Sequence, residues 1–198
     1  MKCAQFLSVL VALGVAAPLG ATTVDFEDLT LGDVYHVGDT FVSSGVPITG
    51  QTFFWSAGGP TDNGYTEVEN GGSAGGSGNE LEINNINLAF NFGAAIAGLT
   101  IDFGEYGGNL NVDVNGDFRN FENFDEISGL IVGGVEVTAT GPGAAGQGLG
   151  DLTFDGTINS FAIGGQEFWI DNVTVVPEPT TLALLTSVAL MIRPRRRR

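Results

Sequence analysis

Apolar and polar residues alternate along much of the chain between residues 22 and 175, most clearly towards its C-terminal end. The stretch LTF-DG-TINSF places Asp155-Gly156 between two runs of β-forming residues, and SFAI-GG-QEFWI repeats this arrangement at Gly164-Gly165. Both dipeptides are typical of two-residue hairpin loops. Because side chains alternate between the two faces of a strand, both hairpins would place one apolar set on one face. That set is Leu152, Phe154, Phe161, Ile163, Phe168 and Ile170.

Two more turns follow from the same pairing argument. LIVGGVEVTAT predicts a hairpin with Gly133-Gly134 at its tip. In NVDV-NGD-FRNF, a two-residue loop at Asn115-Gly116 would set Val114 opposite the charged Asp117. Counting Asp117 into the loop sets Val114 opposite Phe118 instead, so the pattern favours a three-residue turn with a bulge.

The remaining strands are short and lack helical periodicity. The segments that read as strands are TTVDFED, TFVSSG, VPITGQTFFW, INLAFNF and LTIDFGE. Ten or so short strands with glycine-rich turns indicate a sandwich or a barrel. We therefore expect an all-β fold over residues 22–175, a single antiparallel β-sandwich with jelly-roll-like topology. Gly58–Asn79, rich in Gly and Ser, reads as a long mobile connection.

Charge is distributed very unevenly along the chain, which has 7 Lys and Arg against 23 Asp and Glu. Between residues 22 and 176, Arg119 is the single basic residue against 22 acidic ones, a formal charge of −21. A surface of this kind repels phosphate backbones, so we exclude nucleic-acid binding. The one cysteine, Cys3, lies outside this segment, which therefore has no disulfide.

The N-terminal 21 residues have the layout of a secretory signal peptide. Lys2 precedes an apolar run from Phe6 to Ala17, and small residues follow. We expect cleavage after Ala21 and export of the remainder of the chain.

The C-terminal residues 176–198 form a second targeting segment. The apolar run Thr181–Ile192 would span about 18 Å as a helix, less than the roughly 30 Å core of a bilayer. The arginines after it favour the cytoplasmic side of the membrane, so the tail is expected to pause in the inner membrane as a short transmembrane helix. These arginines are Arg193, Arg195, Arg196, Arg197 and Arg198.

The order of parts in this tail resembles the PEP-CTERM sorting signal of Gram-negative bacteria. The processing motif is Val176, Pro177, Glu178 and Pro179, followed by the apolar run and the arginine cluster at the extreme C-terminus. The resemblance implies recognition by an exosortase, a membrane-embedded transpeptidase-like enzyme that removes the tail near Pro-Glu-Pro. Proteins with this signal are associated with exopolysaccharide and with the cell envelope, the cell surface or the extracellular matrix.

Catalytic constellations are scarce in this sequence, and we expect no catalytic residue. A Ser-His-Asp triad needs a histidine beside a serine and a carboxylate, but His36 is the only histidine and no G-x-S-x-G motif occurs. A glycosidase needs two carboxylates at a defined separation, and 22 acids make an accidental pair uninformative. A secreted polysaccharide hydrolase remains the alternative to a binding or structural protein.

Two sets of oxygen-bearing residues suggest calcium. Asp113, Asn115 and Asp117 have the alternating spacing of a calcium loop. Phe118 stands where an EF-hand needs glycine and Phe124 where it needs glutamate, so this stretch reads as the turn described above.

The second set joins the two ends of the domain. VDFED and FWIDNVTV resemble the first and last strands of galactose-binding-like, carbohydrate-binding jelly rolls. The resemblance implies a structural calcium held by Glu27 and Asp171, which match the family's ligand positions. The other reading keeps both as solvated acids at strand ends.

Aromatic residues are the candidates for glycan contact, because sugars pack against exposed rings. The candidates are Trp55, Tyr65 and Trp169, with Tyr106 as a further possibility. Strand alternation puts Trp169, Asp171 and Val173 on one face, opposite Phe168 and Ile170, unless a bulge intervenes. We expect an exported, non-catalytic component of the exopolysaccharide layer, either structural or in contact with glycans.

Overall fold

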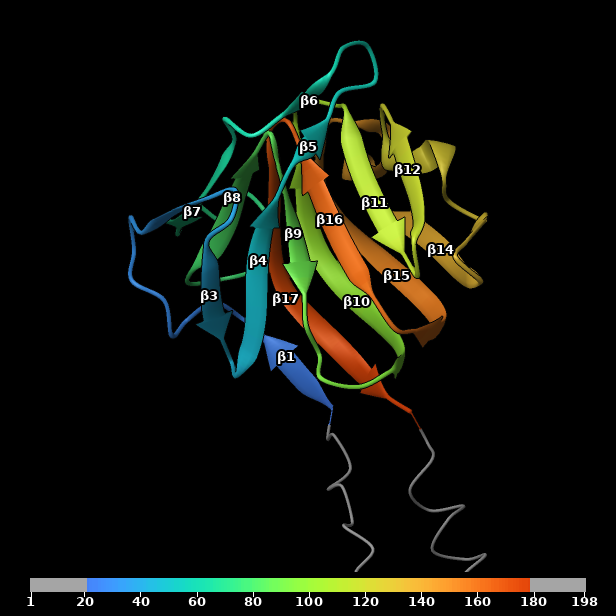
Figure 1. Ribbon diagram of the computed structural model, residues 1–198, viewed down its shortest axis with the longest axis horizontal. Helices are drawn as coiled ribbons and strands as arrows, with labels where there is room; N and C mark the ends of the chain where they lie inside the picture. The colour runs from blue at the N-terminus through green and yellow to red at the C-terminus, as the bar shows by residue number, and fades with distance from the viewer. Residues whose placement is uncertain (1–20, 179–198) are drawn as a thin grey trace, which may run out of the picture.

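Two antiparallel sheets pack face to face in residues 21–178, which are the residues that the computed structural model describes (Figure 1). Every strand pair among these residues is antiparallel. The all-β, sandwich-like architecture predicted from the alternation is confirmed. The described residues form seventeen strands, more than the ten or so predicted, because several are only two or three residues long.

The larger sheet has nine strands. In spatial order its strands are β13 (Ile131–Val132), β14 (Val135–Thr140), β15 (Gly148–Ile158), β10 (Ile96–Glu105), β17 (Phe168–Pro177), β8 (Glu80–Asn84), β7 (Tyr65–Glu69) and β2 (Val34–His36). The ninth strand, β1 (Thr22–Val24), also pairs with β17.

The smaller sheet has six strands. In order they are β12 (Asp117–Phe121), β11 (Leu110–Val114), β16 (Phe161–Gly165), β9 (Ile86–Phe90), β4 (Val46–Gln51) and β3 (Thr40–Ser43). A two-stranded ribbon of β5 (Phe53–Phe54) and β6 (Pro60–Thr61) lies at the top in Figure 1. Two 3-10 helices, η1 (Phe124–Glu126) and η2 (Pro142–Ala145), complete the described elements.

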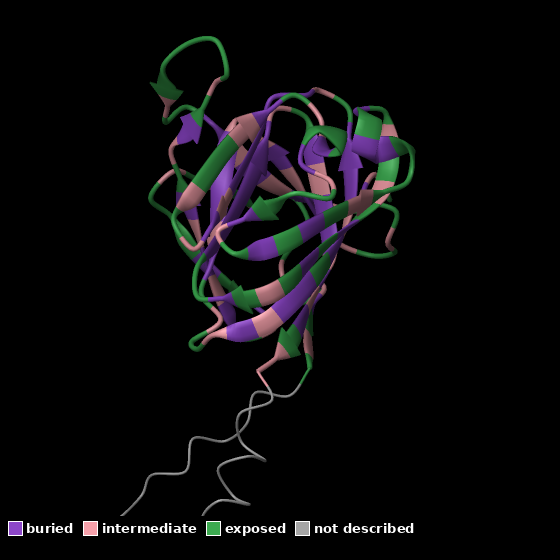
Figure 2. Cartoon of the chain, turned by 90° about the vertical axis from the view of Figure 1, so that its right-hand side faces the viewer, coloured by how far each residue is buried: buried purple, intermediate pink, exposed green. Residues whose placement is uncertain are grey.

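The core lies between the two sheets, and strands alternate buried and exposed residues along their length (Figure 2). All six residues of the predicted apolar set are buried in it. Ring contacts join the layers: Phe154 of β15 and Phe161 of β16 meet edge-on, with ring centroids 5.0 Å apart. A second cluster gathers Phe103, Phe124 and Phe168. Burial of these rings adds to the burial of the aliphatic residues that make up most of the core.

The predicted hairpin at Asp155-Gly156 is wrong. Both residues lie inside β15, where Gly156 has φ +142°. Opposite this point, Gly98 pairs with Asp155 but Ile96 with Ile158, so β15 carries one extra residue. The dipeptide therefore forms a β-bulge within β15 and not a hairpin loop. A glycine with positive φ is common in β-bulges as well as in tight loops.

The predicted hairpin at Gly164-Gly165 is also wrong, because β16 and β17 belong to different sheets. Phe161 pairs with Phe90 and with Val114, whereas Phe168 pairs with Ile83 and with Glu105. The chain between β15 and β16, and between β16 and β17, crosses from one layer to the other. Both crossings still direct the apolar set into the core, which is why the alternation was consistent with hairpins.

The remaining turn predictions have opposite outcomes. The hairpin at Gly133-Gly134 is confirmed, since Val132 pairs with Val135. The three-residue turn is wrong: Val114 pairs with Asp117 across a two-residue Asn115-Gly116 loop in which both residues have positive φ. Asp117 is satisfied there by the guanidinium of Arg119 at 2.8 Å and by the N–H of Gly133 at 3.0 Å.

The predicted strand segments are confirmed, but the prediction omitted β2, β6, β7 and β8. They contain β1, β3, β4, β5, β9 and most of β10. The connection predicted over Gly58–Asn79 includes β6 and β7, so it is not a structureless run.

Both ends of the described chain lie at the same end of the body. Thr22 pairs with Val175, so β1 and the end of β17 run side by side (Figure 1). Within residues 21–178 the structure has no helix of the length and apolarity needed to cross a bilayer. Most of the predicted signal peptide, Pro179, the apolar run and the arginine cluster lie outside the described residues.

Candidate functional site

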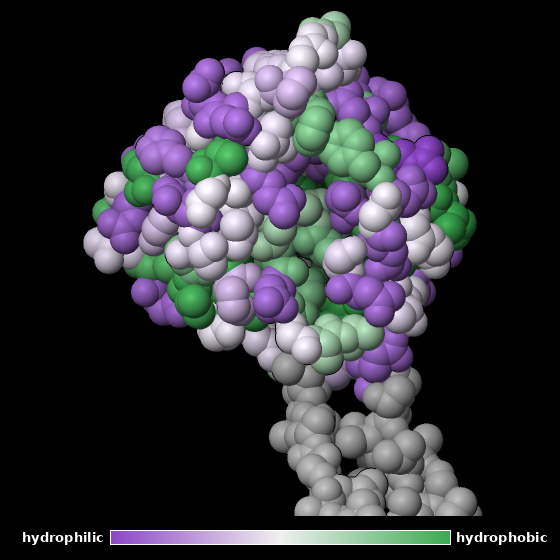
Figure 3. Space-filling view, viewed as in Figure 1, coloured by the Kyte–Doolittle hydropathy of each residue, from purple (hydrophilic) through white to green (hydrophobic). Residues whose placement is uncertain are grey.

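A groove of about 390 Å³ lies on the outer face of the six-stranded sheet (Figure 3). Its floor is low because β16 presents only Ala162 and Gly164 to this face, and its walls are side chains of the neighbouring strands. Asn111 of β11 and Asn87 of β9 stand opposite Gly164 on its two sides. A Cβ added at Gly164 would overlap Asn87 Oδ1, so glycine is needed here to keep the hollow open.

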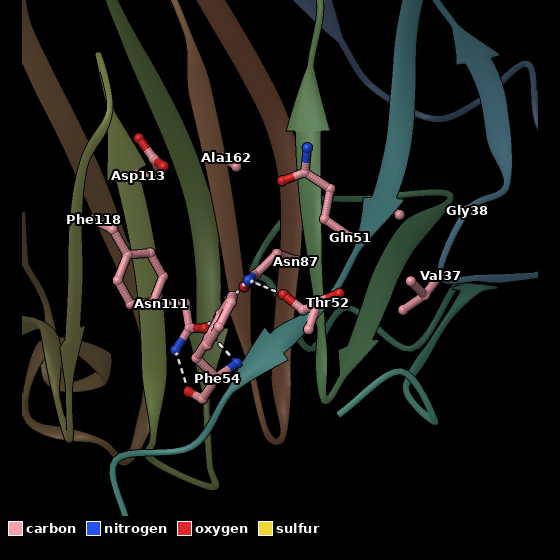
Figure 4. Close-up of a pocket in the computed structure, with 11 residues that line it drawn as sticks. Val37, Gly38, Gln51, Thr52, Phe54, Asn87, Asn111, Asp113, Phe118 and Ala162 are labelled. Carbon is pink, nitrogen blue, oxygen red and sulfur yellow. Dashed lines mark hydrogen bonds between the residues drawn. The ribbon is translucent and has the colours of Figure 1, made fainter. Parts of the chain in front are cut away.

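Two exposed phenylalanine rings stand at one end of the groove (Figure 4). Phe54 is 43% exposed and Phe118 is 40% exposed. Their rings meet edge-on with centroids 5.2 Å apart. Exposed aromatic pairs of this kind offer apolar C–H and π surface to a ligand at little conformational cost.

Asn87 has a side-chain oxygen that is buried without a partner. The residue is 5% exposed, and its Nδ2 donates to the carbonyl of Thr52 at 2.7 Å and to Asn111 Oδ1 at 3.2 Å. Its Oδ1 has no donor among the described residues. An unmade hydrogen bond of this kind costs about 1–3 kcal/mol. A hydroxyl donor entering the groove would supply the missing bond.

Asparagine side chains also fix the position of Phe54. Asn111 Oδ1 accepts the Phe54 N–H at 3.0 Å, and Asn111 Nδ2 donates to the Phe54 carbonyl at 2.9 Å. Asn120 Nδ2 donates to the same carbonyl at 2.6 Å. Figure 4 shows the Asn111 contacts as dashed lines. The ribbon is thereby held against the sheet face, with the ring of Phe54 beside that of Phe118.

On the other side of the sandwich, the structure brings the two predicted calcium residues into one acidic cluster. Asp171 is 1% exposed and lies at a bulge in β17, where Asn172 adopts φ +48°. Glu27 follows β1 and is exposed. Glu27, Glu80 and Asp102 are all close enough to act electrostatically on the Asp171 carboxylate.

A glycine-rich loop over residues 70–79 covers this cluster. A Cβ at Gly76 would overlap the carboxylate of Asp171, and one at Gly78 would overlap that of Glu27. The loop backbone therefore lies so close to the two carboxylates that a side chain at either glycine position would force the carboxylate to move. The loop's N–H groups face carboxylates: Asn79 N–H donates to Glu27 Oε1 at 2.9 Å.

The same loop is pinned at its centre. Glu80 is buried, and its two carboxylate oxygens accept the N–H groups of Ser73 at 2.9 Å and Ala74 at 2.7 Å. The hydroxyl of Tyr106 donates to the Ser73 carbonyl at 3.2 Å. The prediction of a mobile connection therefore does not describe this part of the chain, whose glycines serve close packing.

Burial raises the pKa of Asp171 to about 6. The N–H of Asn172 opposes the rise, and the charges of Asp102, Glu80 and Glu27 add to it. The carboxylates around Asp171 are oxygen ligands of the kind that a hard cation such as calcium takes, although Asn172 Nδ2 and its backbone N–H also donate to Asp171. Residues 21–178 contain no group of three or more His, Cys, Asp and Glu side chains arranged to hold a metal ion. Glu27 and Asp171 would thus need further oxygen ligands to hold a cation.

The three predicted aromatic candidates are not brought together. Trp55 packs edge-on against Phe53, with centroids 5.3 Å apart. Tyr65 is a half-buried residue of β7. Trp169 donates its Nε1–H to Glu69 Oε2 at 2.9 Å and meets Tyr106 edge-on. None of the three lines the groove described above.

The bulge in β17 also corrects the predicted face of Val173. Val173 is fully buried in the core together with Ile170, so it does not share a face with Trp169 as predicted. The register of β10 against β17 shifts between Thr100 and Asp102, which places the extra residue at Asn172. The prediction had named a bulge as the condition under which it would fail.

Sequence reasoning missed the groove residues Asn87, Phe54 and Phe118. Alternation in INLAF already places Asn87 opposite the core face, but its neighbours come from distant segments. Only the order of strands in the sheet, which alternation does not give, joins these residues. Comparisons with protein-family models, with curated proteins and with solved structures found no match to this chain.

Proposed function

We propose that this chain is an exported, non-catalytic protein of the bacterial envelope or extracellular matrix that binds glycan in the groove of its six-stranded sheet. The observation that carries the proposal is the unpartnered, buried Oδ1 of Asn87 next to the exposed rings of Phe54 and Phe118. A sugar ring offers a C–H face for the rings and a hydroxyl donor for the amide oxygen, so it matches both features.

The charge of the groove favours a neutral glycan. Of the residues 21–178 that line it, Asp113 alone is charged, and its carboxylate would repel uronic acids, sulfates and phosphates. The formal charge of −21 over residues 22–176 acts in the same direction at longer range. We therefore expect binding of uncharged polysaccharide and little binding of its anionic counterparts.

The same lining argues against hydrolysis in this groove. Glycoside hydrolysis uses two carboxyl groups on either side of the scissile bond. Among the described residues that line the groove, Asp113 is the one carboxylate. The competing hydrolase hypothesis would need a second acid that the groove does not supply.

Export and sorting form the second part of the proposal. The signal-peptide layout of residues 1–21 and the PEP-CTERM-like tail of residues 176–198 support secretion across the inner membrane and processing by an exosortase. The position of Thr22 beside Val175 is consistent with two targeting segments that leave the body at one end. In this scheme the tail contacts the membrane only transiently.

A structural calcium and a jelly-roll-like strand order complete the proposal. The close approach of Gly76 and Gly78 to the Asp171 and Glu27 carboxylates, and the other acidic residues around Asp171, support calcium. Glu27 and Asp171 would hold the ion, which would supply positive charge that offsets their mutual repulsion. Its part would be to tie the loop over residues 70–79 to the ends of β1 and β17, away from the groove.

The test is a binding measurement with a matched pair of polymers. Isothermal titration of the purified exported chain with a soluble neutral β-glucan, and with the same polymer oxidised at C6 to a polyuronate, should show binding to the neutral form only. Phe54→Ala and Phe118→Ala should each weaken binding about five- to tenfold. Ile131→Ala, which removes an exposed apolar residue of β13 that does not line the groove, is the control.

Two outcomes would reject the proposal. Unchanged affinity in both phenylalanine variants would show that the groove is not the binding site. Reducing ends released from the neutral polymer would favour the hydrolase.

A further inference from the structure

The first part of the Pro-Glu-Pro motif belongs to the folded body. Strand β17 continues through Pro177, and its last residues pair with β10: Val176 lies opposite Gly98 and Pro177 opposite Ile96. The motif therefore does not begin after the domain ends, as residues 22–175 alone would suggest. Val176 and Pro177 are the last paired residues of β17 in the nine-stranded sheet.

Glu178 is attached to the body by its side chain. Its Oε1 accepts a hydrogen bond from the hydroxyl of Thr157 at 2.8 Å. Thr157 lies on β15, the strand on the other side of β10, because Ile96 pairs with both Pro177 and Ile158. The Glu178 side chain thus reaches across the start of β10 and fastens the motif to a third strand.

Attachment of this kind restricts where an enzyme can act. An enzyme that cleaves a peptide binds it as an extended segment and takes up its backbone hydrogen bonds. Backbone that is already paired within a sheet becomes available only when the strand end opens locally. Val176 and Pro177 are paired, so a cut at or before Pro177 would first require this opening.

We infer that the folded domain keeps Val176, Pro177 and Glu178 as the end of β17 and that the sorting enzyme cuts on the C-terminal side of Glu178. This inference rests on the proposed exosortase processing. The bond that breaks is a peptide bond beyond Glu178. Its carbonyl carbon passes to the enzyme's nucleophile and then to water or an acceptor amine, and its nitrogen leaves with a proton on the released tail.

The motif then has a structural role in the folded domain in addition to its role as a sorting signal. Thr22 lies opposite Val175, next to the point where the motif begins, so the two predicted processing points share one end of the sandwich. The enzyme would meet the motif at a fixed place on a folded surface.

Hydrogen exchange on the full chain tests the strand directly and does not depend on any enzyme. Backbone amides in the peptide 173–178 should exchange more slowly than in the unfolded chain. Thr157→Val should speed exchange of the Val176 and Glu178 amide hydrogens about fivefold, the effect of one lost hydrogen bond. Thr153→Val on the same strand, also exposed, should leave it unchanged. Exchange at the unfolded rate in the wild-type chain would overturn the inference.

The position of the cut is read from the mature protein made in an exosortase-bearing host. Mass spectrometry of its C-terminus should find Glu178 retained. A C-terminus at Pro177 or earlier would overturn the inference and leave the proposed sorting intact. A fully retained tail would instead reject the exosortase part of the proposed function, and with it the cut, while the exchange result would still decide whether the motif is a strand.

Discussion

Small residues have opposite effects on the two outer faces of the sandwich. On the six-stranded sheet, Gly164 and Ala162 leave a hollow that stays open, and a buried amide oxygen of Asn87 faces it unpaired. On the nine-stranded sheet, Gly76 and Gly78 let backbone approach carboxylates, whose oxygens accept the N–H groups of the covering loop. An unsatisfied, open face is suited to a ligand, and a satisfied, covered face is suited to stability.

The largest effect is expected from a side chain placed under the covering loop. Gly76→Ala would drive a methyl group into the Asp171 carboxylate, and overpacking of this kind costs about 1–3 kcal/mol. The melting temperature should fall by roughly 2–10 °C. Gly59→Ala is the matched control, since a Cβ there meets nothing within 4 Å. Equal melting temperatures for the two variants, measured by thermal denaturation, would show that the loop is not a packed cover.

Calcium should strengthen the covered face. If Glu27 and Asp171 hold the ion, calcium at a hundredfold excess over its dissociation constant would stabilise the folded chain by about 2.7 kcal/mol. Asp171→Ala should lose most of this gain. Glu136→Gln, an exposed acid on β14, should keep it. A melting temperature that does not respond to calcium or to EDTA would remove the site.

Some features of the fold could be predicted from the sequence and others could not. The core set was predictable because burial follows alternation, and Phe154 and Phe161 are both buried as expected. Their connection was not predictable. A hairpin within one sheet and a crossing between two sheets both turn the same side chains inward, so alternation does not distinguish them.

The sites divide in the same way. The juxtaposition of Glu27 and Asp171 was anticipated through a resemblance in two terminal strands, and the structure places the two in one acidic cluster. The covering loop was misinterpreted, because a Gly-Ser composition is shared by mobile linkers and by backbone packed too closely for side chains. The groove was missed because its residues meet only through strand order.

A smaller effect on stability is expected from a difference between two buried side-chain oxygens that lack hydrogen-bond partners, one on Asn87 and one on Glu105. Asn87 lines the groove and its Oδ1 is buried without a donor among the described residues, whereas Glu105 Oε2 belongs to a residue with no exposed surface. Burial raises the pKa of Glu105 from 4.5 to about 7, although the Gly108 N–H opposes this rise. Protonation of the Glu105 carboxylate removes the cost of burying its charge. Asn87 Oδ1, in contrast, needs a hydrogen-bond donor from outside the described chain.

The pH dependence follows from linkage. Between pH 4.5 and 7 the folded chain holds a proton on Glu105 that the unfolded chain has released, so Glu105 lowers the free energy of unfolding as pH rises through this window. Glu105→Gln should flatten this loss and make the chain more stable at pH 8 by about 1–2 kcal/mol. Glu136→Gln is the control, because Glu136 is an exposed acid on β14 and is not among the groups that act on the pKa of Glu105. Urea titrations at pH 5 and pH 8 measure both. Parallel pH profiles for wild type and Glu105→Gln would contradict the expectation.

The smallest effect on stability is expected at the open face, and this is where the comparison is most exposed to failure. The rings of Phe54 and Phe118 meet edge-on and both residues are exposed, so a double-mutant cycle with alanine should give a coupling of about 0.5–1.5 kcal/mol. Neither single variant should lower the unfolding free energy by more than about 1 kcal/mol, while each weakens glycan binding. Binding surfaces can lose side chains in this way because their contacts are completed by a ligand and not by the fold. If Phe118→Ala instead destabilised the chain as much as Gly76→Ala, the rings would be part of the packing, and the two faces would not differ in kind.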